Sequence, residues 1–88
     1  MFTLTKHYHN TGDISTTTYT SKYSDWSTCH NALHKLIDND KVTRIEFDKH
    51  RMIIHYGDHH LEVELRNNDL MKLIPISEVV SIKGVHRD

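Results

Sequence analysis

The chain has few of the residues that cross-link or interrupt a fold. Its 88 residues include one cysteine, one proline and three glycines. The single Cys29 cannot form a disulfide within the chain, which excludes a disulfide scaffold and is typical of a reducing compartment. With three glycines in all, the chain has no glycine-rich loop of the kind that cradles phosphate groups. We therefore expect a cytoplasmic protein that holds together by its core alone.

Long apolar runs are also missing. Residues 52–54 form one of the longest runs, at three residues, whereas a helix that crosses a bilayer needs about 20. Residues 1–6 lack the basic segment that opens a signal peptide, so we expect neither secretion nor a transmembrane helix. A hydrophobic fraction of 36% and a mean hydropathy of −0.62 are enough for one modest core. The chain is therefore expected to form a single domain over residues 1–88, without a large buried cavity.

A strong excess of one charge is the third absence. Eleven Lys and Arg residues oppose twelve Asp and Glu residues, for a formal net charge of −1. The chain therefore shows neither the basic excess usual for nucleic-acid binders nor the acidic excess of a DNA mimic, and the balance points to no partner. What the chain does have is nine histidines. Because histidine titrates near pH 6.5, protonation of all nine would raise the formal charge from −1 to +8.

The first part of the chain is expected to form a hairpin of two strands. Residues 2–9 alternate in polarity, and residues 14–20 are rich in β-branched threonine, both of which are typical of strands. The Asn10-Thr11-Gly12 segment between them suits a three-residue hairpin loop. The resulting register would pair Tyr8 with Ile14 and Thr5 with Thr17 and would leave His7 and His9 on the more polar face.

One amphipathic helix should follow. Ser24 or Asp25 is a good N-cap, and the helical period then continues to about Asn39. His30 and His34 are four residues apart and lie on one flank of the apolar stripe. The stripe that should face the core consists of Trp26, Cys29, Leu33, Leu36 and Ile37.

A three-stranded meander is the clearest prediction for the second half of the chain. Its strands are residues 42–48, 51–56 and 60–66, joined by two-residue turns at 49–50 and 57–58. The second turn has Gly57 in the first central position, as a type II′ turn prefers. The inward face would then carry Ile45, Phe47, Met52, Ile54, Tyr56, Leu61, Val63 and Leu65.

The same turns predict which outward residues lie side by side. Directly opposed residues in an antiparallel sheet have Cβ atoms about 4.5–5.5 Å apart, so His55 and His60 should touch. The outward residues form three predicted rows: Arg44, His55 and His60; Glu46, Ile53 and Glu62; and Asp48, Arg51 and Glu64.

The last twenty residues are less regular. Residues 67–69 are expected to form a turn, residues 70–74 one helical turn that Pro75 stops, and residues 76–82 a last strand at an edge or contact. The predicted fold class is therefore α+β. It is an antiparallel sheet of five to six strands with one amphipathic helix packed on one face, in the order ββαβββ, then a short turn or helix and a last strand.

Three histidine pairs have a spacing that metal ligands use. His7 and His9 are two residues apart on a strand, His30 and His34 are four residues apart on the helix, and His55 and His60 are the cross-strand pair. No finger, ribbon or metalloprotease spacing is present. Solvated surface histidine and adventitious binding to a nickel column are therefore the simpler alternatives, and we expect no cofactor. A further alternative is a pH-responsive surface at the row of Arg44, His55 and His60. The candidate metal ligands are His7, His9, His30, His34, His55 and His60.

Catalytic arrangements are not evident. Cys29 lies on the apolar stripe of the helix, so a core role is expected rather than a nucleophile. Glu62 and Glu64 share the outer face of one strand, which a solvated charged face explains. We therefore expect a protein that is not an enzyme.

A protein-interaction module is the leading functional expectation, because one helix can cover only one face of such a sheet. Either the open face or a free edge strand could bind a partner protein, and a homodimer through the last strand is a further option. The alternatives are a histidine-dependent metal-binding protein and a nucleic-acid-binding module that uses the open sheet face. The candidate partner-binding residues on that face are Arg44, Glu46, Ile53, His55, His60 and Glu62.

In length and element order alone, the chain resembles the small proteins that bacteriophages encode to inhibit host machinery, including anti-CRISPR proteins. No sequence motif carries this resemblance, so it transfers no site residues. It implies a phage or mobile-element inhibitor that blocks a host protein sterically.

Overall fold

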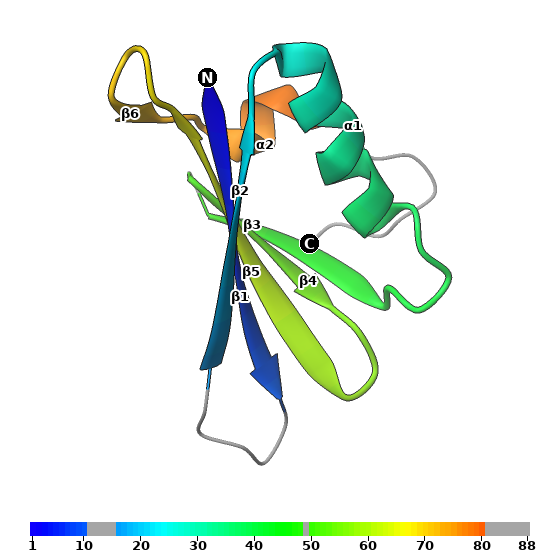
Figure 1. The fold of residues 1–88 in the computed structure, drawn as a ribbon. Helices are drawn as coiled ribbons and strands as arrows, with labels where there is room; N and C mark the ends of the chain where they lie inside the picture. Colours follow the sequence, from blue (N-terminus) through cyan, green and yellow to red (C-terminus); the bar gives the residue numbers. More distant parts are fainter. Residues whose placement is uncertain (11–15, 49, 81–88) are drawn as a thin grey trace.

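The computed structural model describes residues 1–10, 16–48 and 50–80. They form one antiparallel sheet in the order β2-β1-β5-β4-β3, with β6 paired to β5, and two helices (Figure 1). The α+β class and the predicted ββαβββ order are therefore confirmed. The elements are β1 (Phe2–Asn10), β2 (Thr16–Tyr23), α1 (Trp26–Ile37), β3 (Arg44–Asp48), β4 (Arg51–His55), β5 (His59–Asn67), β6 (Lys72–Leu73) and α2 (Ile76–Val79).

The central pair of the sheet joins the first strand, β1, to β5, which lies far from it in the sequence. β1 pairs antiparallel with β5 along its whole length, so that Leu4 lies opposite Leu65 and His9 opposite His60. This pairing connects the first hairpin to the meander and makes β2 and β3 the two edges of the main sheet. It also brings outward residues of β1 beside those of β5.

The meander has the predicted register. Phe47 lies opposite Met52, and Ile54 lies opposite Leu61. The Tyr56 N–H donates to the His59 carbonyl at 2.9 Å and closes the hairpin around Gly57 and Asp58. Gly57, however, does not take the positive φ that a type II′ turn requires, so that prediction is wrong. Of the first turn, Lys49 lies outside the described residues.

The register of the first hairpin differs from the prediction by three residues. Thr5 pairs with Thr20 rather than Thr17, and Tyr8 pairs with Thr17; Ile14 lies outside the described residues. β2 extends to Tyr23, which pairs with Phe2. In the predicted register, the last two residues of β2 would have passed the start of the chain without partners.

The core lies between the sheet and the two helices. Asp25 caps α1 as predicted, since its Oδ1 accepts from the Thr28 N–H at 2.9 Å. The helix ends at Ile37, two residues before the predicted Asn39. The Tyr56 hydroxyl donates to the Leu36 carbonyl at 3.2 Å and ties the end of α1 to the sheet. The buried residues are Leu4, Cys29, Leu33, Ile37, Ile45, Met52, Ile54, Leu61, Val63, Leu65, Ile76 and Val80.

The predicted helical turn and last strand are wrong. Met71 takes a φ of 52°, in the left-handed region, which ends the turn before a helix can form. Residues 72–73 then pair with β5 as β6. Residues 76–79 form the short helix α2 because Ile76 and Val80 are buried at i,i+4 spacing, and the Val80 N–H donates to the Ile76 carbonyl at 3.2 Å. The end of the predicted strand, residues 81–82, lies outside the described residues.

Both helices pack on the same face, α1 over β1 and β2 and α2 over β3 and β4. We name this the inner face and its opposite the outer face. No helix in the described part of the chain is long and apolar enough to cross a membrane.

Candidate functional site

The outer face consists of rows that cross the whole sheet. The three rows predicted for β3, β4 and β5 are all present. The pairing with β1 and β2 extends them. The row that contains most histidines runs Thr16, His9, His60, His55 and Arg44. The next row runs Thr18, His7, Glu62, Ile53 and Glu46.

The six residues predicted to bind a partner lie together, in the β3, β4 and β5 parts of these two rows. Three of them form a paired group around Glu46. Arg44 Nη2 lies 2.7 Å from Glu46 Oε1, and His55 Nε2 lies 3.1 Å from Glu46 Oε2. The hydrogen bond from His55, followed by the nearby charge of Arg44, holds the pKa of Glu46 below its ordinary value, although burial opposes the shift. The placement of this set is therefore confirmed, while its role as a partner-binding surface stays a prediction.

Three histidine rings lie next to one another along the first row. The rings of His9 and His60 stack with centroids 4.7 Å apart, and those of His60 and His55 lie 5.7 Å apart. The predicted contact of His55 with His60 is thus confirmed. Burial, together with the charges of His9 and His55, lowers the pKa of His60.

Glu62 joins two of these histidines in a compact group. Donor atoms of His9, His60 and Glu62 all lie within 4.8 Å of one another. Among the described residues, no other three His, Cys, Asp or Glu side chains come this close. Sequence reasoning placed Glu62 on the outer face but did not count it as a ligand. The missing signal was the β1–β5 pairing, which brings His9 beside His60.

Among the described residues, neither the helical pair His30 and His34 nor His7 belongs to a group of three such ligand atoms. The rings of His30 and His34 lie 4.4 Å apart on α1, and the Trp26 ring lies 5.6 Å from His30. His7 shares the outer face with His9, but its Nδ1 lies 2.9 Å from Thr18 Oγ1 in the neighbouring row. Of the six candidate metal ligands, the structure therefore groups His9 and His60 with a carboxylate.

Cys29 is completely buried in the core. Burial raises the pKa of its thiol, so the thiol remains protonated near neutral pH. This is the core position that the helical pattern predicted.

The edge strand β2 is the second feature that a partner could use. Residues 16–20 and Lys22 are exposed, and among the described residues only β1 pairs with this strand. An unpaired edge presents a row of backbone N–H and C=O groups to solvent. At the opposite edge, β3 is only five residues long and carries Arg44, Glu46 and Asp48. Short length and charge both protect an edge from strand addition, so β2 is the more receptive edge.

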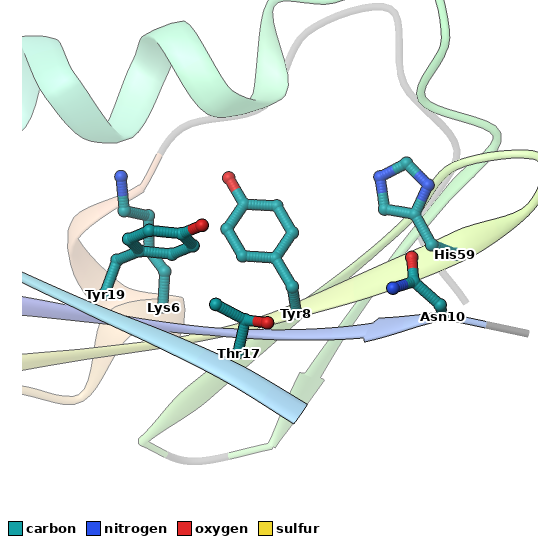
Figure 2. A pocket seen from close by; sticks show the side chains of 6 residues that line it. All are labelled: Lys6, Tyr8, Asn10, Thr17, Tyr19 and His59. Atoms are coloured by element: carbon teal, nitrogen blue, oxygen red, sulfur yellow. The ribbon is translucent and has the colours of Figure 1, made fainter. Parts of the chain in front are cut away.

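An open hollow of about 420 Å³ adjoins β2 on the inner face (Figure 2). The ring of Tyr19 packs edge-on against that of Tyr8, with centroids 5.4 Å apart. Tyr19 is 53% exposed. Figure 2 shows Lys6, Tyr8 and Tyr19 projecting from the sheet towards the side on which the helix lies. The lining residues are Lys6, Tyr8, Asn10, Thr17, Tyr19 and His59.

No protein-family model matches this chain, and neither a curated protein nor a solved structure matches it.

Proposed function

We propose that this protein is a non-catalytic protein-interaction module that binds an extended segment of another protein along β2. By covering that segment it would block the partner sterically, as a phage or mobile-element inhibitor of a host protein does. Its expected location is the cytoplasm, where Cys29 stays reduced.

The open edge of β2 is the observation that carries the proposal. The strand is eight residues long, and Lys22 is its only charged residue. An added strand would gain main-chain hydrogen bonds along this edge without removing several charges from water. Threonine and tyrosine, which make up six of the eight residues, also favour the extended conformation.

The outer face alone is a poorer binding surface. Arg44 and Glu46 are already paired, and Arg51 lies 3.1 Å from Asp48 and 3.7 Å from Glu62. A partner that covered these charged groups would remove them from water. Because they already form ion pairs within the chain, they would gain few new interactions with the partner, and the binding free energy gained would be small. The face is better suited to contacts at the rim of an interface centred on β2.

The hollow supports the same location. Successive side chains of an added strand point to alternate faces of the sheet, so those on the inner face would lie beside Tyr19 and the hollow. Backbone hydrogen bonds between β2 and the added strand would supply affinity. The hollow would provide specificity, because it would accept only some side chains at the inward position of that strand. Because two tyrosines and four polar residues line the hollow, the partner segment is expected to carry an aromatic residue with a polar end, such as tyrosine, at that position.

Site-specific photocrosslinking in a bacterial lysate tests the proposal. A photoreactive p-benzoylphenylalanine replaces Tyr19 in one variant and Leu70 in the matched control, which is 65% exposed in the turn before β6. We expect position 19 to capture one cellular protein that position 70 does not capture. Genes next to the coding sequence provide a second line of support if they are phage early genes or a defence locus.

Two proline variants test whether the open backbone edge of β2 is responsible for binding the captured protein. Successive N–H groups along a strand point to opposite sides, so one of Thr17→Pro and Thr18→Pro removes a bond to β1 while the other removes a group at the open edge. Thermal unfolding identifies the edge variant as the one that keeps its melting temperature. In that variant, the yield of the crosslinked protein from position 19 should fall at least tenfold. Retention of the crosslink, equal capture from position 70, no capture at all, or capture of a second copy of this chain would each contradict the proposal.

A further inference from the structure

We propose that His9, His60 and Glu62 bind a divalent transition-metal ion, with zinc the best match, on the outer face of the sheet. Their donor atoms already lie within 4.8 Å of one another. His9 Nε2 lies 3.7 Å from Glu62 Oε1. Ligand atoms at the corners of a zinc tetrahedron are about 3.4 Å apart when each bond is about 2.1 Å long. Small side-chain rotations would therefore complete the site without moving the backbone.

His9 supplies the strongest indication of a ligand. Its Nε2 is shielded from solvent yet has no hydrogen-bond partner, the one such side-chain atom in the described part of the chain. Buried polar atoms normally have a partner, so an unpaired nitrogen beside two other ligand groups indicates a place for an ion. The other ring nitrogen, Nδ1, lies 3.3 Å from Thr16 Oγ1. Thr16 can therefore hold the ring with Nε2 directed at Glu62, which is how outer groups orient a metal-binding histidine.

Glu62 is oriented in a similar way. Its Oε2 lies 3.7 Å from Arg51 Nη1, whereas Oε1 faces His9. One carboxylate oxygen is thus directed towards the metal position while the other faces a fixed cation. Because β1 and β5 are the central pair of the sheet, the three ligands project from a rigid backbone.

The ligand set indicates which ions would bind. Two imidazoles and one carboxylate suit zinc, cobalt, nickel and copper, while magnesium and calcium prefer oxygen ligands alone. Three protein ligands leave a fourth position for water or for a donor from another molecule. His55 is not counted in the set, because its Nε2 lies 3.1 Å from Glu46 Oε2 and 3.3 Å from Arg44 Nη2.

Calorimetric titration of untagged, metal-stripped protein with ZnCl₂ is the direct test, and visible absorption of the Co²⁺ form reports the coordination. We expect one ion per chain and a four-coordinate cobalt spectrum. His60→Ala and Glu62→Gln should each weaken zinc binding at least about tenfold. Circular dichroism and the melting temperature of the metal-free variants show that both remain folded. Glu62→Gln is the more informative change because it removes the charge and keeps the shape.

The matched control is the double variant His30→Ala, His34→Ala, which removes the close histidine pair on α1. Its zinc affinity should stay within about twofold of the wild type. If this variant loses binding, or if the outer-face variants keep it, the binding is adventitious and the proposal is wrong. Magnesium binding as tight as zinc binding, or the absence of zinc binding, also overturns it. The proposal is independent of strand addition at β2, because the titration uses the purified chain alone.

Discussion

Ile53 and Ile54 are neighbours in β4, yet they belong to surfaces with different physical roles. Ile54 is 0% exposed and packs in the core beneath the helices. Ile53 is half-buried on the outer face and lies in register between Glu46 and Glu62. The inner face stabilises the protein by burying apolar surface. The outer face is a layer of paired charges and stacked histidines that contributes little burial and leaves chemical groups within reach of a ligand.

Substitution of each isoleucine in turn measures this difference. Ile54→Thr should lower the free energy of unfolding by about 3 kcal/mol, because it removes buried methyl groups and places a hydroxyl in an apolar environment. Ile53→Thr keeps the β-branched shape that a strand favours, so its cost should be below about 1 kcal/mol. Urea denaturation followed by circular dichroism gives both values. Equal losses would mean that the outer face is also covered in solution, and the comparison of the two faces would fail.

The helix cap provides the next largest effect, since α1 is the layer that covers much of the inner face. Asp25 accepts hydrogen bonds from both the N–H and the hydroxyl of Thr28, at 2.9 and 3.0 Å. Asp25→Ala leaves that N–H without its partner and should lower the melting temperature by about 5 °C. Asp25→Asn keeps a side-chain acceptor and should retain most of the stability. A loss as large for Asn as for Ala would show that the carboxylate charge matters more than the hydrogen bond.

The meander could be registered from sequence because its turns are short. A two-residue loop fixes which residues oppose each other, and strict alternation then decides which face each occupies. This is why His55 and His60 were correctly placed in contact. The first hairpin was registered on a three-residue loop at residues 10–12, but β1 ends at Asn10 and β2 begins only at Thr16, so its register was wrong by three residues.

The pairing of strands that lie far apart in the sequence could not be predicted from local sequence patterns. Fifty residues separate His9 from its partner His60, and no local pattern selects β5 over β3 as the neighbour of β1. The sequence therefore predicted His9 and His60 as candidate metal ligands in two separate pairs, and it predicted Glu62 as a solvated charged residue. It did not predict that the three form one site. Near the end of the chain, Ile76 and Val80 fit both helical and alternating spacing, so a short apolar run was predicted as a strand and is a helix.

The smallest effect is expected from the charges of the outer face, and it appears only in acid. Because hydrogen bonding to His55 lowers the pKa of Glu46 in the folded protein, the unfolded chain binds a proton at this position more readily. The stabilisation is therefore present above the ordinary pKa of 4.5 and is lost as the pH falls through the folded-state pKa. Glu46→Gln should flatten the dependence of melting temperature on pH between about 5 and 3, by less than the shift caused by Asp25→Ala. Parallel curves for the variant and the wild type would show that the ionisation of Glu46 is not coupled to folding, and that its ion pairs do not stabilise the protein.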